Sequence, residues 1–192
     1  MSSSTVHTSN TDLAYPIDQN QANRWSPYDF EPHRPIPDEH IKQLFEAARW
    51  APSSFNAQPW RYLYAHQGEP GFDRIFKLLM PGNQTWAKDA SLLILSLAKL
   101  SLDSRPGRNG AAAYDTGAAN LALVLQATSL GLHVHQMGGF DRQAAQEEFK
   151  LDTDLEPRVV LAVGYLGAEG QAKAEGEFRK ARLTQEAFTT RL

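Results

Sequence analysis

The sequence contains no cysteine and no long hydrophobic run. Without cysteine the chain has no disulfide, no thiolate metal ligand and no cysteine nucleophile. Its longest apolar run, residues 92–97, is far too short to cross a bilayer. Residues 1–16 lack the basic and apolar segments of a secretory signal. We therefore expect a cytoplasmic protein without a membrane-spanning segment.

Strong charge of either sign is also absent, because the net charge is only −3. A net charge this small and negative does not predict binding to nucleic acid or to an anionic membrane. A chain of 192 residues with 42% hydrophobic and 21% charged residues is typical of one globular domain. Residues 1–22 are rich in Ser, Thr, Asn and Gln, which predicts a flexible N-terminal arm followed by a single domain, 23–192.

Several catalytic and nucleotide-binding signatures are missing. No G-x-G-x-x-G follows a predicted strand, so a Rossmann dinucleotide site is unsupported, and there is no Walker loop. No G-x-S-x-G elbow supports a serine hydrolase. His133 and His135 are two apart on a predicted strand and face the same way, but no third ligand accompanies them, so we predict no metal site.

The remaining pattern alternates helices with strands. A helix is predicted from near Pro37 to the residue before Pro52, with Asp38 and Glu39 in its first turn. Further helices are predicted over 71–80, 111–130 and 142–150, and strands over 61–65, 92–98, 132–136 and 158–165; 99–110 is expected to be a loop and 167–176 flexible. This order predicts one sheet sandwiched by helices.

The predicted helix 111–130 is rich in small residues in its first half. Gly117 costs about 1 kcal/mol relative to alanine inside a helix, so its presence predicts a packing reason. Small side chains let a second helix approach closely.

The stretch 52–60, PSSFNAQPW, holds two hydroxyls, two amides and two prolines. Pro52 and Pro59 fix φ and remove two backbone donors, which predicts a stiff loop with aimed polar side chains. A helix C-terminus followed by an ordinary Asn/Ser turn is the alternative. Elsewhere, Arg24 and Ser26 near the start and Lys180 and Arg182 near the end are candidate phosphate ligands, although a lone basic residue is more often a solvated surface charge.

The stretch 51–60 resembles the signature loop of the nitroreductase family. Four more segments match that family in order, namely 24–30, 83–90, 131–140 and 180–183. The resemblance covers about residues 23–184. It implies an α+β fold of three layers, α/β/α, with a central, mostly antiparallel sheet, built as an intertwined homodimer. It also implies FMN bound between subunits, with NADH or NADPH as electron donor.

The resemblance assigns cofactor-binding positions but no catalytic side chain, because the flavin carries the chemistry. Arg24 and Ser26 with Lys180 and Arg182 would bind the phosphate, and Asn83 the pyrimidine edge. The loop 52–56 would come from the partner subunit. The full set of expected FMN-binding residues is Arg24, Trp25, Ser26, Tyr28, Pro52, Ser53, Ser54, Asn56, Asn83, Gln136, Met137, Gly138, Gly139, Lys180 and Arg182.

Three positions depart from the family pattern. Gly138 stands where many members have Glu, Tyr28 where many have Arg or Lys, and Trp86 where some have Lys. We expect these changes to affect the redox chemistry of the flavin rather than its binding. The expected reaction is hydride transfer to flavin N5 and then to an electron-poor acceptor, such as a nitroaromatic or a quinone, by a ping-pong cycle. A flavoprotein that stores or senses FMN and an enzyme that reduces an enone-like compound are the alternatives; the nicotinamide preference stays open.

Overall fold

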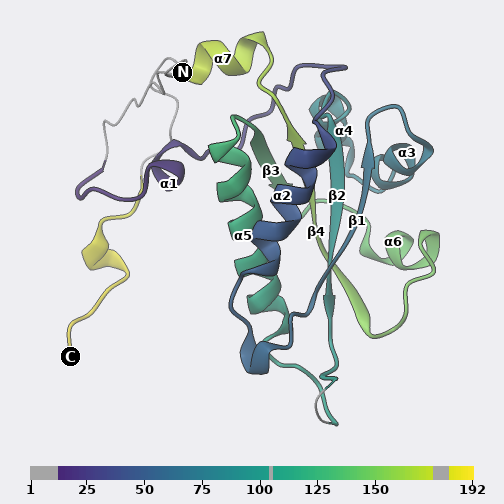
Figure 1. Cartoon of the computed structure of the whole chain (residues 1–192), viewed down its shortest axis with the longest axis vertical. Coiled ribbons are helices and arrows are strands. Elements are labelled where there is room, and N and C mark those ends of the chain that lie inside the picture. Colours follow the sequence, from purple (N-terminus) through teal and green to yellow (C-terminus); the bar gives the residue numbers. More distant parts are fainter. Residues whose placement is uncertain (1–12, 104–105, 175–181) are drawn as a thin grey trace.

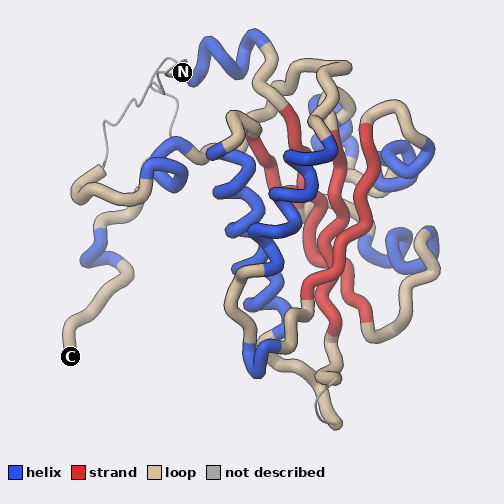
Figure 2. Tube along the Cα trace, viewed as in Figure 1, coloured by secondary structure: helices blue, strands red, loops and turns tan. Residues whose placement is uncertain are grey.

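The protein is built around one four-stranded antiparallel sheet in the order β1-β2-β4-β3 (Figure 1). The computed structural model describes residues 13–103, 106–174 and 182–192. The strands are β1 (Trp60–His66), β2 (Leu92–Lys99), β3 (His133–Met137) and β4 (Leu155–Gly164). Figure 2 shows the strands enclosed between helices on both sides.

The central strands are apolar because they are buried on both faces. In β2 every residue from Leu92 to Ala98 is buried, and successive side chains point to opposite faces of the sheet. Leu93 and Leu95 therefore belong to one core cluster, and Leu92 and Ile94 to the other. The alternation explains why two helical layers are needed to cover this sheet.

The first layer consists of α2 (Asp38–Arg49) and α5 (Ala112–Ser129). Both helices pack on the sheet face that contains Leu92, Ile94 and Leu161. α2 follows Pro37 and α5 ends before Gly131, whose φ of 72° suits glycine beyond a helix C-terminus. These two helices agree with the sequence prediction to within a residue or two.

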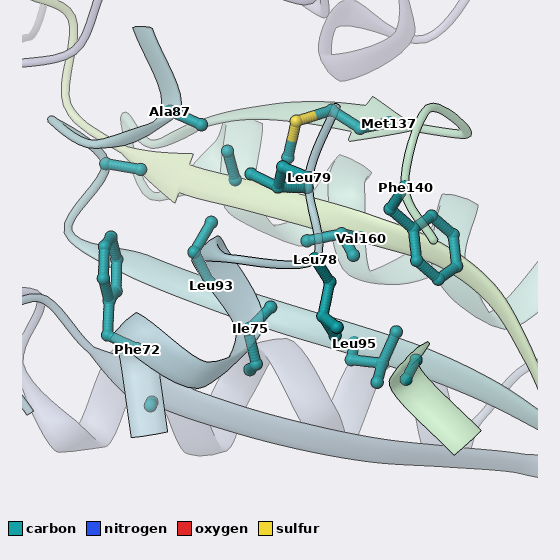
Figure 3. Close-up of a cluster of buried hydrophobic side chains, with 14 of the residues drawn as sticks. Phe72, Ile75, Leu78, Leu79, Ala87, Leu93, Leu95, Met137, Phe140 and Val160 are labelled. Atoms are coloured by element: carbon teal, nitrogen blue, oxygen red, sulfur yellow. The ribbon is translucent and has the colours of Figure 1, made fainter. Parts of the chain in front are cut away.

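The second layer consists of α3 (Pro70–Phe76), α4 (Pro81–Ala87) and α6 (Arg142–Glu148). Figure 3 shows the cluster that they form with the opposite sheet face, where Phe72, Ile75 and Leu79 pack near Leu93 and Val160. The predicted three-layer α+β fold is confirmed, and the sheet is entirely antiparallel within the described residues.

Two segments differ from the sequence prediction. The prediction of a flexible stretch over 167–176 is wrong for α7 (Ala168–Ala174), because the carboxylate of Asp29 accepts a hydrogen bond from the backbone N–H of Gly170 at 2.9 Å. The other is the predicted helix 71–80, which ends at Phe76 and is followed by a separate helix, α4, that covers Gly82 and Asn83. Proline at its first position explains its start.

The chain ends lie beside the three-layer body. α1 (Gln19–Asn23) straddles the predicted boundary between arm and domain, and its N-terminus is capped by Asp18. It packs on α5, where Ala22 is buried. The C-terminal segment 182–192 contains the short helix η2 (Gln185–Ala187) and lies apart from the sheet in Figure 1. Across the described residues, no helix is both long and apolar enough to cross a membrane.

The outer face of α5 is apolar and exposed. Tyr114 is 82% and Leu121 is 44% exposed, and a Cβ placed on Gly117 between them would meet no atom within 4 Å. The packing reason predicted for Gly117 is therefore not found among the described residues of this subunit.

Candidate functional site

The predicted site residues fall into two groups within one subunit. The first group lies around β3 and α4 and consists of Arg24, Trp25, Ser26, Tyr28, Asn83 and 136–139. Together with the neighbouring Trp86, His133 and His135, which were not predicted as site residues, we call it the β3-edge surface. The second group is the 52–58 loop, which joins α2 to β1 and contains the short helix η1 (Ser54–Asn56). Lys180 lies outside the described residues, and Arg182 is exposed in the C-terminal segment.

The amide of Asn83 is fixed against the chain after β3. Its Nδ2 donates to the carbonyl of Gly139 at 3.0 Å, and the backbone N–H of Met80 donates to the same carbonyl at 3.0 Å. A Cβ on Gly139 would lie 3.0 Å from that Nδ2, so glycine is needed for this close approach. A Cβ on Gly138 would meet no described atom within 4 Å, so a side chain could begin there without a clash.

Three rings pack together beside β3, and two of them, Tyr28 and Trp86, stand where the resemblance to the family implies cations in other members. Tyr28 is 62% exposed, and its ring centroid lies 5.3 Å from Trp86 and 4.6 Å from His135. Trp86 and His135 are also 4.6 Å apart. The cluster therefore replaces point charges with an aromatic surface. No positively charged side chain belongs to it.

The histidine of this cluster is held in one tautomer. Nδ1 of His135 lies 2.8 Å from the carbonyl oxygen of Pro27, so Nδ1 carries the proton and donates it. Burial lowers the pKa of His135, although the Pro27 bond opposes this shift. His135 thus stands beside Tyr28 as a neutral ring whose Nε2 is an acceptor.

His133 is the second titratable group on this face of β3. Its ring packs edge-on against Trp25 with centroids 5.9 Å apart, and its buried Nδ1 has no hydrogen-bond partner among the described residues. Burial lowers the pKa of His133 from its ordinary value of 6.5 to about 4. Both histidines are therefore neutral near pH 7. No group of three metal-ligating side chains occurs among the described residues.

The other residues of the β3-edge surface differ in access. Arg24 and Ser26 are brought together, since Nη1 of Arg24 donates to Oγ of Ser26 at 3.5 Å. Gln136 is exposed, whereas the side chain of Met137 is buried in the core. Met137 can therefore contribute to a ligand site through its backbone alone.

The 52–58 loop is closed by its own hydrogen bonds, as the prediction of a stiff loop requires. Oγ of Ser53 accepts a hydrogen bond from the backbone N–H of Gln58 at 3.0 Å. The backbone carbonyl of Ser53 accepts one from the backbone N–H of Asn56, also at 3.0 Å. The guanidinium of Arg61 donates to the carbonyl of Gln58 at 2.9 Å. Asp115, which the sequence did not single out, accepts from the N–H of Ser54 at 3.0 Å. An acidic residue in a first helical turn carries no sequence signal of such a role.

The 52–58 loop and the α4 part of the β3-edge surface lie on opposite sides of the sheet. The loop is bonded to α5 in the first layer, whereas α4 and its Trp86 belong to the second. In Figure 1 the loop lies below the end of α2, and α4 lies at the top. β1 alone, with seven residues, spans roughly 20 Å. The 52–58 loop and the residues around α4 are therefore well separated within one chain.

Comparison with known proteins identifies the family of this fold. Residues 22–80 and 76–165 match the model of the Nitroreductase family. The chain belongs to the nitroreductase family. A solved structure described as an oxidoreductase containing FMN is 34% identical, with a TM-score of 0.86 and 96% of both chains covered. A nitroreductase family protein from Clostridium difficile 630 is 26% identical, with a TM-score of 0.72 over 89% of this chain and 95% of that one.

A sequence relative extends the comparison to a named activity. A protein of Rhodopseudomonas palustris (strain TIE-1), provisionally named an NADH dehydrogenase/NAD(P)H nitroreductase, is 28% identical over 154 residues. The match covers 71% of this chain and 78% of that protein. This chain is accordingly a nitroreductase-family enzyme.

The close approach at Gly139 generates a first prediction. Gly139→Ala should destabilise the protein by about 1–3 kcal/mol, because the new Cβ must displace the amide of Asn83. Gly138→Ala is the matched control and should change stability by less than about 0.5 kcal/mol. Urea unfolding of both variants measures this, and equal stabilities would contradict the described contact.

The buried histidines generate a prediction for pH. The folded pKa of His133, about 4, lies below its ordinary 6.5, so the unfolded chain binds the proton first. Stability should therefore fall as the pH falls from 6.5 towards 4, by up to about 1.4 kcal/mol per pH unit for each such group. His133→Phe should remove the contribution of His133 to this pH dependence of stability and leave the contribution of His135. Urea unfolding at several pH values tests this; an unchanged slope would show that His133 is charged in the folded protein.

Proposed function

We propose that this enzyme binds FMN between two subunits and transfers electrons from NADH or NADPH to an electron-poor acceptor. The observation that carries the proposal is the separation of the β3-edge surface from the 52–58 loop by the sheet and its helices. A homodimer would bring the loop of one subunit to the β3-edge surface of the other. The FMN named in the description of the 34% identical structure supports the choice of cofactor.

The residues fit the phosphate end of FMN. Arg24 and Ser26 already face each other and would supply a guanidinium fork and a hydroxyl. Lys180 and Arg182 would add positive charge from the C-terminal part of the chain. Arginine gives bidentate geometry, and lysine a point charge. Because the aromatic cluster itself contains no cation, these basic residues would fix the orientation of the cofactor.

The residues also fit the flat ring. Asn83 would offer its amide, which donates and accepts, to the pyrimidine edge. Gly138 and Gly139 have no side chains that could cover the backbone after β3. The backbone N–H groups there can therefore approach a flat ring closely. Tyr28 and Trp86 would form the aromatic boundary of this edge.

When bound, FMN supplies hydride acceptance and donation in a ping-pong cycle, and the protein supplies binding and electrostatics. The described side chains are assigned no acid or base role, because the flavin itself carries the hydride chemistry. A nitroaromatic or a quinone fits the class of acceptor.

The proposal is tested by the spectrum of the purified protein. We expect a yellow protein that releases FMN, not FAD, on denaturation and bleaches when NADH or NADPH is added without oxygen. Addition of a quinone should restore the colour. A colourless protein that does not bind added FMN would overturn the cofactor. FMN that no nicotinamide reduces would favour a storage or sensor role.

The neutral aromatic cluster predicts a redox effect. Reduction places negative charge on the N1–O2 edge of the flavin, which a nearby cation stabilises more than a tyrosine hydroxyl does. Tyr28→Arg should raise the two-electron potential by about 30 mV or more, the equivalent of a tenfold change in equilibrium. A redox titration of wild type and variant measures the shift. A potential that stays equal or falls would place Tyr28 away from that edge.

The exposed face of α5 predicts the assembly. Gly117→Trp should not clash within the subunit, since no atom lies within 4 Å of a Cβ there. It should nevertheless raise the dissociation constant of the dimer at least about tenfold, and the separated subunits should lose FMN. Gln143→Trp, exposed on α6 in the opposite layer, is the control. Light scattering and flavin retention measure both effects; a Gly117→Trp dimer with full FMN would contradict this interface.

A further inference from the structure

Asp115 is a buried acidic residue that the proposed chemistry does not use. It lies in the first turn of α5 and is 4% exposed. Its Oδ2 accepts a hydrogen bond at 3.0 Å from the backbone N–H of Ser54, a residue 61 positions earlier in the chain. A buried carboxyl group is costly unless hydrogen bonds compensate for the lost water, so this contact is a specific one.

The loop that receives this contact has an unfavourable backbone conformation. Phe55, Asn56 and Gln58 have φ values of 54°, 54° and 45°, in the left-handed region. Residues with a Cβ disfavour that region, and it persists when the surroundings hold the chain there. Three such residues within four positions indicate that the loop depends on its attachments for its shape.

The attachments of the loop come from different parts of the fold. The bonds of Ser53 come from the loop itself, and those of Arg61 come from the strand that follows it. The bond to Asp115 ties the loop to α5, whose outer face carries Gly117 and Tyr114. Asp115 thus connects the strained loop to the helix that the proposed function places at the subunit interface.

We propose that Asp115 is a positioning residue, which holds the 52–58 loop in the shape that presents Ser54 and Asn56 to the FMN of the partner subunit. It acts through the backbone of Ser54 and does not contact the cofactor. This inference rests on the proposed function for the identity of the ligand. The attachment of the loop to α5 does not depend on it.

The test compares three variants of the full-length protein. Asp115→Ala removes the acceptor, and Asp115→Asn keeps an amide oxygen that can accept from Ser54. The matched control is Asn120→Ala, because Asn120 is also buried in α5, at 3% exposure, but accepts from Tyr62 and Ser96 of the sheet instead of the loop. The readouts are hydrogen exchange of 52–58 without FMN, FMN affinity by fluorescence titration, and thermal unfolding.

We expect Asp115→Ala to speed exchange in the loop and weaken FMN binding about tenfold, the scale of one hydrogen bond to a charged group. Asp115→Asn should stay within about threefold of wild type. Asn120→Ala should lower the unfolding temperature but leave loop exchange and FMN affinity unchanged. Wild-type exchange and affinity in Asp115→Ala, or equal losses in Asn120→Ala, would overturn the inference.

A second pair of variants removes the same bond from the other side. Ser54 is the first residue of η1, a position that accepts proline, and Ser54→Pro deletes the N–H that Asp115 binds. Ser54→Ala keeps that N–H and is its control. Faster loop exchange in the proline variant alone would support the inference, and equal exchange would overturn it. A wild-type protein that binds no FMN would refute the proposed function, whereas loop exchange would still decide the role of Asp115.

Discussion

Burial of β2 and β4 on both faces is the constraint on which the rest of the structure depends. Because Leu92 and Leu93 point to opposite sides, each side needs its own helical layer. The layers then separate the polar loop beside α5 from the polar surface beside α4. The distance between the two halves of the proposed site is thus a consequence of how the core is packed, and the proposed dimer would bring the two halves together.

The core was predictable because its elements follow simple periodicity. The apolar run of β2 and the stripe of α2 are strong local signals. β4 begins three residues earlier than predicted, because it continues through Pro157. A register shift opposite Ser96 and Leu97 accommodates this proline, and no local pattern announces such a bulge.

The parts that sequence reasoning missed depend on contacts between distant segments. α7 is held by Asp29, and the 52–58 loop by Asp115, in both cases across many residues of chain. The same holds for the cluster of Tyr28, Trp86 and His135, which three different segments supply. The resemblance named Tyr28 and Asn83 as site residues, but it did not include the histidine that packs beside Tyr28. Side-chain neighbours of this kind follow from the tertiary fold alone.

The placement of the loop and the β3-edge surface on opposite sides of one subunit has a genetic consequence in the proposed dimer. Each dimer would contain two sites, and each site would draw on both chains. A chain altered in the loop and a chain altered at Asn83 would each form homodimers with two damaged sites. A mixed dimer of the two would hold one doubly damaged site and one intact site, so two inactive alleles would restore activity when they are expressed together.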